Sequence, residues 1–452
     1  MKRIWIPLLA LLASPIAIGD ALSSNCHTED AGIVLPPGFC ATIFADGLGT
    51  ARHLAVRDNG DVLVMSPDTD GGTWMGKPRV SGRGVVVALR DEDEDGRADR
   101  AQRFGQGRGT GIALSENHLY LGLNDAVVRY RIDPDAFVPT GSPEVIVRSF
   151  PYQLQHAAKS LALDGDGGLY VNVGAPSNAC QRIPRTPGIE GKDPCPQREL
   201  QAGIWRFAAD RTNQRHGTDG HRLAAGVRNA IALSWRAQDG QLYAVQHGRD
   251  QLHQLWPEWY DAAQGAELPA EEFLRLDTGS DFGWPYCYYD HQRAQRMLAP
   301  EYGGDGRLHE RCDNYPPPIA AFPGHWAPNA LVFYDRQAFP ETYRDGAFIA
   351  FHGSWNRSPQ PQQGYRVTFL PFDESGPSGP PITFAHGFAG SEAISSPRQA
   401  RFRPTGLAVA PDGALFIADS QQGRIWRVHY QPTAEKTAAR SISGYPKTSP
   451  VP

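Results

Sequence analysis

Hydrophobic residues recur along this chain in a sixfold pattern. Each copy has a short apolar run, a turn rich in Asp, Asn and Gly, and a second apolar run; the copies begin at Arg52, Gly109, Ala157, Asn229, Asn329 and Thr405. A third apolar run follows each copy, beginning at Gly82, Ala126, Ala202, Asp250, Gly364 and Gly423. Runs rich in Val, Ile, Leu, Tyr and Trp, separated by turns such as DNG and PDG, are typical of β-hairpins.

Repetition at this period predicts six four-stranded antiparallel blades. One such sheet cannot bury both of its faces, so the blades must pack around a central channel in a ring that closes and protects its edges. We therefore predict an all-β protein, a six-bladed β-propeller over residues 22–430. Uneven spacing places two insertions on one rim, at about residues 174–201 and 257–327.

The two ends of the chain differ from the repeats. Two basic residues, an apolar run from Ile4 to Ile18 and small residues after it have the order of a secretory signal. The run is too short to span a membrane. We expect residues 1–21 to be a signal peptide, the protein to be periplasmic or secreted, and the mature chain to lack a membrane span. Residues 431–452 contain little apolar material and are predicted to be a disordered tail.

The six cysteines fit an oxidising compartment. Sequence does not determine how they pair, but neighbours along the chain would close three short loops outside the blade strands. The predicted disulfides are Cys26 with Cys40, Cys180 with Cys195, and Cys287 with Cys312. No CxxC pair occurs, which makes a thiolate metal site a weak interpretation, and no CxxCH is present, which excludes a covalently attached c-type haem.

Charge and motifs narrow the function classes. The chain has 44 basic and 49 acidic residues and a net charge of −5, which argues against nucleic-acid binding and against a polybasic membrane anchor. It lacks the GxGxxG, GxxxxGK[ST], HExxH and GxSxG signatures. Nucleotide-binding, zinc-protease and serine-hydrolase functions are therefore disfavoured.

Polar residues stand at the start of blade strands or just after them, where they would face the channel. They are His156, Lys159, Arg228, Asn229, His247, Gly248, Arg249, Asn356, Arg357, Arg401 and Arg403. Cations gathered around one axis would form a positive funnel that favours a ligand with several negative charges. In the alternative interpretation, each Arg pairs with an Asp of a neighbouring blade and joins the two blades.

Several strings in these segments are uncommon. They are LQHAAKSLAL, VGAPSNAC, DPCPQRELQAGIWRF, GVRNAIALSW, HGRDQL, FGWPYCYY, FHGSWNRSP and RFRPTGLAV. From about Leu35 to Tyr430 the chain resembles the L-sorbosone and pyranose dehydrogenase branch of the soluble quinoprotein sugar dehydrogenases. The resemblance implies a six-bladed propeller that holds pyrroloquinoline quinone (PQQ) over the channel together with Ca²⁺. PQQ carries three carboxylates, the kind of anion that a positive funnel would bind.

The resemblance also implies residue roles. His156 would be the general base that takes the substrate hydroxyl proton while hydride passes to the quinone. The remaining cofactor contacts would be Arg228, Arg357 and one or both of Arg401 and Arg403 for carboxylates and quinone oxygens, with Lys159, Asn229, His247 and Asn356 beside them. The backbone carbonyls of Gly248 and Arg249 would bind Ca²⁺. Without the resemblance, His156 would be interpreted as a buried structural histidine.

The chain departs from the glucose dehydrogenase branch beside the base. An acidic residue orients the histidine in that branch, but Ala175 occupies the position in this chain, so the orienting group is not identified by sequence. The resemblance therefore favours the sorbosone and pyranose branch over glucose as substrate. Trp284 and Trp355 are candidates for stacking on a sugar ring, although core packing is the commoner use of Trp.

A second calcium candidate is visible in the loop DEDEDGRAD. Asp91, Asp93, Asp95 and Asp99 occupy positions one, three, five and nine of an EF-hand-like loop. Position twelve is Gln102 where an EF-hand has Glu, so the loop is incomplete. It is consistent either with a structural calcium site or with a solvated acidic turn.

These observations lead to one functional hypothesis and two alternatives. The hypothesis is PQQ- and calcium-dependent oxidation of a sugar or a sugar-derived aldehyde or alcohol, with electrons passed to an external quinone or cytochrome. One alternative is a calcium-dependent sugar lactonase on the same propeller, which would need carboxylates and amides rather than arginines in the channel. The other is a non-catalytic propeller that binds carbohydrate or protein on its rim.

Overall fold

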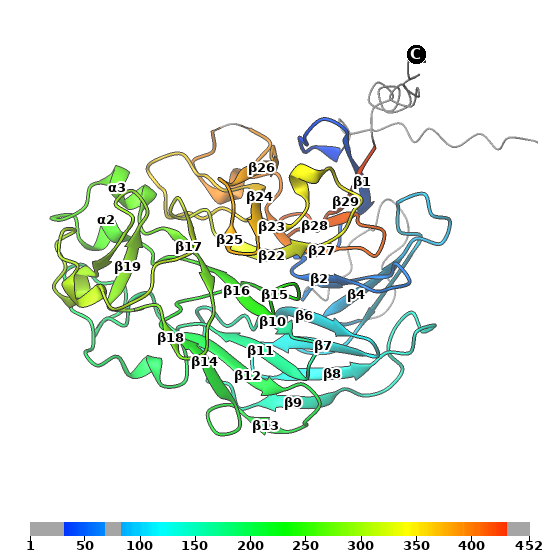
Figure 1. The fold of residues 1–452 in the computed structure, drawn as a ribbon, viewed down its shortest axis with the longest axis horizontal. Coiled ribbons are helices and arrows are strands. Elements are labelled where there is room, and N and C mark those ends of the chain that lie inside the picture. The colour runs from blue at the N-terminus through cyan, green and yellow to red at the C-terminus, as the bar shows by residue number, and fades with distance from the viewer. Residues whose placement is uncertain (1–30, 68–82, 392, 432–452) are drawn as a thin grey trace, which may run out of the picture.

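The structure is a computed structural model that describes residues 31–67, 83–391 and 393–431. The predicted signal peptide lies outside the described residues, as does the predicted tail beyond its first residue. Six antiparallel sheets follow one another along the described chain, and each has four main strands (Figure 1). The predicted all-β, six-bladed propeller is confirmed.

In each blade the strands follow one another from the innermost, at the channel, to the outermost, at the rim. The first blade contains β2 (Leu54–Val56), β3 (Val62–Met65), β4 (Val86–Arg90) and β5 (Arg100–Phe104). The second contains β6 (Gly109–Ser115), β7 (His118–Leu123), β8 (Val127–Arg131) and β9 (Glu144–Arg148). The third contains β10 (Leu161–Leu163), β11 (Gly168–Val173), β12 (Gly203–Ala208) and β14 (His221–Ala225).

The second half of the chain continues the series. The fourth blade contains β15 (Ala232–Arg236), β16 (Gln241–Gln246), β17 (Glu271–Arg275) and β21 (Ala320–Phe322). The fifth contains β22 (Pro328–Tyr334), β23 (Gly346–Phe351), β24 (Arg366–Asp373) and β26 (Ile382–Ala385). The sixth contains β27 (Pro404–Val409), β28 (Leu415–Asp419), β29 (Ile425–Tyr430) and β1 (Phe39–Ala45). Three short strands extend the second, third and fifth blades: β13 (Gln214–Arg215), β18 (Ser280–Asp281) and β25 (Gly376–Pro377).

The sixth blade closes the ring with strands from both ends of the described chain. β1 pairs antiparallel with β29, from Phe39 opposite Tyr430 to Ala45 opposite Ile425. Innermost strands of neighbouring blades contact one another in the order β2, β6, β10, β15, β22, β27 and back to β2. This arrangement removes exposed sheet edges between the first and last repeats, as the closure argument requires.

Hydrophobic clusters lie between the blades. The apolar faces predicted from the repeats meet in separate clusters at each of the six blade interfaces of the described chain. Trp426 and Phe348, for example, are both fully buried between the fifth and sixth blades. Because each sheet buries apolar side chains against two neighbours, the stability of one blade depends on the complete ring.

One predicted strand is wrong. The segment DQLHQLW was predicted to be the third strand of the fourth blade, but it forms the helix α2 (Leu252–Leu255). Leu252 and Leu255 are three residues apart and both buried, a spacing that suits a helix as well as a strand. The third strand is instead β17, so the predicted insertion over residues 257–327 contains two strands of the blade itself.

The true insertions gather at one side of the ring. Figure 1 shows α2, α3 (Ala262–Glu267) and β19 (Cys287–Asp290) projecting together from the propeller. β19 forms a two-stranded sheet with β20 (Gln295–Leu298).

No helix in the described ranges combines the length and apolar character needed to cross a membrane.

Two half-buried histidines bridge blades. His53 precedes β2, and its Nε2 lies 2.7 Å from the carbonyl oxygen of Asn329 in the fifth blade. His352 follows β23, and its Nε2 lies 2.7 Å from Oγ of Ser420 in the loop after β28. Burial lowers the pKa of His53 to about 4, and burial together with Arg403 lowers the pKa of His352 well below its usual value. Both rings are therefore neutral near pH 7.

These histidines predict loss of stability in acid. Below about pH 6.5 the unfolded chain takes up protons that native His53 and His352 exclude, so the free energy of unfolding should fall by about 1.4 kcal/mol per pH unit for each. For His53 the decline should continue to about pH 4. Urea unfolding between pH 4 and 8 measures the slope, and His53→Gln should make it shallower. The exposed His386→Gln variant is the control. Equal slopes for wild type and His53→Gln would contradict the assignment.

Candidate functional site

His156 lies in a tight turn before β10. Its φ is +52°, in the left-handed region that is uncommon for residues other than glycine. The buried Gln153 side chain holds this turn by donating from Nε2 to the carbonyls of Gln155, His156 and Gly174 at 2.9, 2.8 and 3.0 Å. A Cβ on Gly174 would lie 2.7 Å from Cβ of His156, so close packing requires glycine there. The turn fixes where the imidazole can reach.

A backbone carbonyl orients the His156 ring. Nδ1 lies 2.6 Å from the carbonyl oxygen of Ala175, and this acceptor requires the proton on Nδ1. Burial, followed by the charge of Arg228, lowers the pKa of His156 to about 3, so the ring is neutral at working pH. Among the described residues no group forms a hydrogen bond with Nε2. The orienting group that sequence could not identify is thus the main chain of the residue that replaces the acidic one.

Arg228 is buried in the middle of a polar cluster. Its Nη2 donates to Oδ2 of Asp250 at 2.9 Å and to Oδ1 of Asn178 at 3.1 Å. Its Nη1 donates to the carbonyl of Gly248 at 2.9 Å. Asp250 also accepts from Arg185 and from Asn356. Burial alone would raise the pKa of Asp250, but Arg228 and Arg185 lower it well below the usual range.

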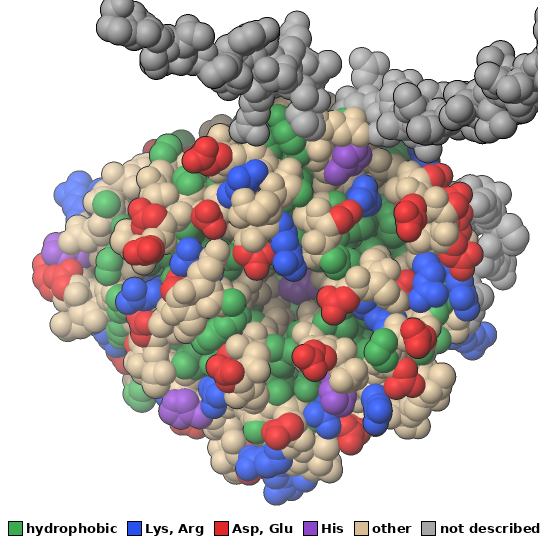
Figure 2. All heavy atoms as spheres, turned by 45° about the vertical axis from the view of Figure 1, so that its right-hand side comes forward, with side chains coloured by type: hydrophobic (Ala, Val, Ile, Leu, Met, Phe, Trp, Pro, Cys, Tyr) green, Lys and Arg blue, Asp and Glu red, His purple; other side chains and the backbone are tan. Residues whose placement is uncertain are grey.

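The expectation of uncompensated cations is therefore wrong for two arginines. Arg228 pairs with Asp250, and Arg357 pairs with Glu267 while donating to the carbonyls of Ala266 and Gly324. The alternative raised from sequence, that a carboxylate pairs with each arginine, holds for Arg357, and for Arg228 with the difference that Asp250 is shared with Arg185. Figure 2 shows a hollow near the middle of one face, with a histidine at its bottom and charged side chains of both signs around it.

Arg403 is different. It donates to the carbonyls of His352 and Gly353 at 3.2 and 2.6 Å, and it forms no ion pair with a described carboxylate. Burial lowers its pKa, and the positive charge of Arg52 adds to that effect. Arg401 is exposed, with its guanidinium carbon 5.0 Å from the ring centre of Phe402. The structure thus directs Arg403, and not Arg401, towards the buried polar groups between the blades.

The other predicted cofactor contacts are buried or half-buried. Lys159 is fully buried; its Nζ donates to the carbonyl of Ala157 at 2.7 Å, and burial lowers its pKa to about 8. Nε2 of His247 lies 2.9 Å from the carbonyl of Pro328, and burial, then Arg228, lowers its pKa to about 4. Asn229 and Asn356 are buried, and the Oδ1 atom of each lacks a hydrogen-bond donor among the described residues.

The predicted calcium carbonyls lie beside this cluster. The amide of Gly248 donates to Oε2 of Glu271 at 2.9 Å, and burial raises the pKa of Glu271 to about 7. Arg249 is buried, and its guanidinium is paired with Glu301. A cavity of about 20 Å³ is lined by Arg228, Gly248 and Arg249 among others, which is room for one water.

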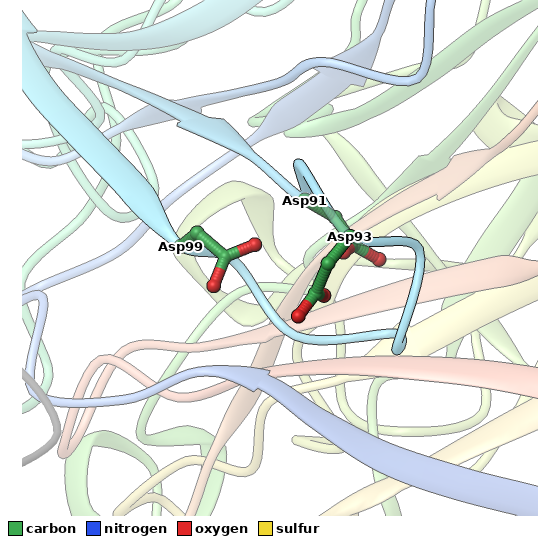
Figure 3. Close-up of side chains that lie close together, drawn as sticks. All are labelled: Asp91, Asp93 and Asp99. Atoms are coloured by element: carbon green, nitrogen blue, oxygen red, sulfur yellow. The ribbon is translucent and has the colours of Figure 1, made fainter.

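Three of the four predicted acidic-loop residues lie close together. Oxygen atoms of Asp91, Asp93 and Asp99 all lie within 4.8 Å of one another (Figure 3). Asp95 is not part of this group; it accepts the amide of Arg97 at 2.8 Å. Oδ1 of Asp91 is buried without a hydrogen-bond partner among the described residues, and burial raises the pKa of Asp91.

Two of the predicted disulfides are confirmed. Cys180 pairs with Cys195, and Cys287 pairs with Cys312. The predicted pair of Cys26 and Cys40 stays a prediction, because Cys26 lies outside the described residues. The confirmed pairs and their cysteines lie in one hydrophobic cluster with Trp284, which is buried and donates from Nε1 to the carbonyl of Asn178. Packing, rather than sugar stacking, is therefore the role of Trp284, whereas Trp355 is half exposed.

Sequence reasoning missed the residues that organise the cluster. Asp250 binds three of its side chains, and Arg185 reaches it from the first insertion. Asp250 was inside the string HGRDQL, so a search for acidic partners of the predicted arginines could have found it. Gln153 and Arg185 carried no comparable signal, because their contacts depend on how the loops fold.

Comparisons with known proteins agree with the fold. A family model described as TrAA12-like matches residues 33–431. The chain is 24% identical over 238 residues to a pyrroloquinoline quinone-dependent pyranose dehydrogenase of Coprinopsis cinerea, which covers 46% of this chain and 31% of that protein. The chain spans less than half the length of the curated relatives that it matches.

Solved structures show the same architecture at low identity. The holo form of the pyranose dehydrogenase PQQ domain from Coprinopsis cinerea superposes with a TM-score of 0.68 at 18% identity, covering 88% of this chain and 97% of that one. An iodide structure of a Trichoderma reesei carbohydrate-active enzyme of family AA12 gives 0.70 at 18% identity, covering 88% and 98%. The chain therefore belongs to the TrAA12-like family, and the resemblance to the PQQ-dependent sugar dehydrogenases is confirmed.

Proposed function

We propose that this protein is a PQQ- and calcium-dependent dehydrogenase that oxidises a sugar or a sugar-derived aldehyde or alcohol. The observation that carries the proposal is the state of the His156 imidazole. The ring is neutral, and the carbonyl of Ala175 accepts the proton that stays on Nδ1, which leaves a free lone pair on Nε2. A group in that state accepts a proton from a substrate hydroxyl. The redox chemistry is supported by the names of similar proteins, among them the PQQ-dependent pyranose dehydrogenase of Coprinopsis cinerea.

The residues present fit an anionic cofactor with a cation. Arg403 is a desolvated guanidinium without a described carboxylate partner, which suits a cofactor carboxylate. The unpaired amide oxygens of Asn229 and Asn356 and the carbonyl of Gly248 are oxygen groups of the kind that Ca²⁺ binds. When bound, PQQ would accept hydride and Ca²⁺ would polarise the quinone carbonyl.

The paired arginines have a narrower role in this proposal. Arg228 and Arg185 both pair with Asp250, so two guanidinium groups face one carboxylate there. Arg357 is the one described cation that pairs with Glu267, so its charge is balanced. We assign Arg403 and Arg228 to cofactor carboxylates and quinone oxygens, and Arg357 chiefly to holding α3 against the fifth blade. His156 keeps its role at the substrate hydroxyl.

The cellular setting is also a proposal. Two disulfides in the described chain support an oxidising compartment, periplasmic or extracellular. Electrons would leave through an external quinone or cytochrome, since the sequence carries no attachment motif for c-type haem.

Reconstitution tests the proposal directly. Purified protein loaded with PQQ and Ca²⁺ should reduce an artificial dye with at least one member of a panel of aldoses and 2-keto-aldehydes, and omission of either PQQ or Ca²⁺ should abolish the rate. Lactones belong in the same panel. Lactone opening without dye reduction would favour the lactonase alternative, and saccharide binding without either reaction would favour a non-catalytic propeller.

We also propose that the Asp91 loop binds a structural Ca²⁺, supported by the three converging carboxylates and the unpartnered Asp91 oxygen. Ca²⁺ at about one hundred times its dissociation constant should then stabilise the fold by about 2.7 kcal/mol through this loop alone. Asp99→Asn should remove that gain in calorimetric unfolding of the cofactor-free protein. Asp95→Asn is the control, since Asp95 lies outside the group. Equal gains in wild type and Asp99→Asn would identify a solvated acidic turn.

A further inference from the structure

The first insertion is a folded loop with a fixed tip. We call residues 177–197 the Cys180 loop, because the disulfide of Cys180 with Cys195 closes it. Inside the loop the buried Gln181 donates from Nε2 to the carbonyl of Thr186 at 3.0 Å. Its Oε1 accepts the amide of Arg185 at 2.9 Å. These bonds hold the backbone of the tip at Arg185 and Thr186 from within the loop.

The Arg185 side chain reaches from this loop into the site. Its Nη2 donates to Oδ2 of Asp250 at 2.7 Å and to Oε1 of Gln155 at 3.3 Å. Its Nη1 donates to Oε1 of Gln251 at 2.6 Å. Gln155 is the residue before His156, and Asp250 is the partner of Arg228. Arg185 therefore lies across the groups that surround the proposed base.

Exposure distinguishes Arg185 from the other groups on Asp250. Its side chain is 28% exposed, compared with 3% for Arg228. Within the described chain its Nε–H has no hydrogen-bond acceptor, while two guanidinium groups share the single Asp250 carboxylate. An entering molecule would meet free donors and surplus positive charge at Arg185 before it could meet Arg228. Arg228 is more deeply buried than Arg185, and it donates hydrogen bonds to Gly248 and Asn178.

Exposed apolar side chains adjoin the same cluster in sequence. Leu154, Ile183 and Trp355 are 85%, 57% and 50% exposed, and they stand one or two residues from Gln155, Arg185 and Asn356, respectively. Exposed apolar side chains and a planar fork of N–H donors are the two kinds of group that bind a pyranose, whose C–H groups pack on apolar or aromatic side chains and whose neighbouring hydroxyls accept paired hydrogen bonds.

We infer that Arg185 contacts the sugar directly and determines substrate selectivity, with the Cys180 loop as its rigid support. The inference rests on the proposed function and adds to it a residue that binds substrate rather than cofactor. In this arrangement Asp250 aligns two guanidinium groups, with Arg228 on the buried side of the site and Arg185 on the open side.

Kinetics of loaded variants test the assignment. For the best sugar, Arg185→Leu should raise KM about tenfold or more while kcat stays within about twofold, because a binding contact equal in ground and transition states is lost. The ratio of kcat/KM between two sugars that differ at one hydroxyl should also change. Arg185→Lys should recover part of the affinity. PQQ titration of the metal-loaded apo-protein, followed by absorbance, should give the same half-saturation for wild type and both variants.

Arg182→Leu is the matched control. Arg182 lies on the same loop, its side chain is 67% exposed, and its ion pair with Glu190 is at the surface. It should leave KM unchanged. A lower Tm with unchanged KM in Arg185→Leu would show that Arg185 only anchors the loop, and weaker PQQ binding with unchanged KM would place it on the cofactor; either result overturns the inference. Wild type that oxidises no sugar overturns the proposed function as well, whereas active wild type with an unaltered Arg185→Leu overturns the inference alone.

Discussion

Replacing His156 with alanine should lower kcat of the PQQ-loaded protein by about 10²- to 10⁴-fold, the usual contribution of a positioned general base. The imidazole is held by Ala175 with its Nε2 lone pair free, and the methyl group of alanine cannot accept the substrate proton. Absorbance of bound PQQ should be retained, since Arg228 and Arg403, which we assign to the cofactor, precede the innermost strands of other blades. Stopped-flow dye reduction with PQQ occupancy measured on the same sample gives the rate per loaded molecule.

Added imidazole should restore part of the His156→Ala rate, with a pH dependence that follows the free base. His386→Ala serves as the control, because His386 is exposed on the loop after β26. If His156→Ala loses PQQ but the remaining loaded molecules turn over normally, His156 is a cofactor contact and not the base.

Asp250→Ala should be the most damaging substitution for stability, with a loss of about 3–5 kcal/mol, the usual result of removing one partner from a buried ion pair. Arg228 would remain buried with a charge that no other described carboxylate neutralises at ion-pair distance. Arg185 and Asn356 would lose the same acceptor. Urea unfolding at pH 7 measures the change in the free energy of unfolding.

Asp412→Ala is the control for that experiment. Asp412 pairs with Arg427 at the surface, and exposed pairs contribute about 1 kcal/mol or less. Asp250→Asn separates charge from packing: it should destabilise by a similar amount, because the amide keeps the shape and loses the charge. A loss below about 1 kcal/mol for both Asp250 variants would mean that water, rather than Asp250, compensates Arg228.

The repeat pattern predicts the architecture well because its causes are local. Alternating apolar positions and the turn residues between them specify hairpins within about twenty residues, and an apolar surface on both faces of each hairpin requires neighbours. The exception is instructive. The apolar residues after Gln246 have a spacing that fits a helix as well as a strand, and Leu252–Leu255 form a helix. The third strand of the blade is β17, which begins about twenty residues later.

The sequence named candidate residues but not the groups with which they form hydrogen bonds and ion pairs. Strand ends and the family resemblance pointed to His156, Arg228 and Arg403, and the structure places all three among buried or half-buried polar groups. The surplus of cations is reproduced only in part: Arg228 and Arg185 share the one carboxylate of Asp250, whereas Arg357 has its own partner in Glu267. Arg357 and Glu267 are 90 residues apart in sequence, and nothing in either local string links them.

From residue order alone one could predict six hairpin repeats, the need for a closed ring and disulfides between cysteines that are neighbours along the chain, and one could name candidate polar residues at the strand ends. Only the folded chain decided that β1 completes the last blade, that a main-chain carbonyl at Ala175 orients His156, and that Asp250 joins Arg228 to Arg185. The division has a physical basis. Periodicity and turn chemistry act between neighbours in sequence, whereas ion pairing and carbonyl contacts depend on which distant segments packing brings within about 3 Å, and a backbone oxygen is the same at every residue.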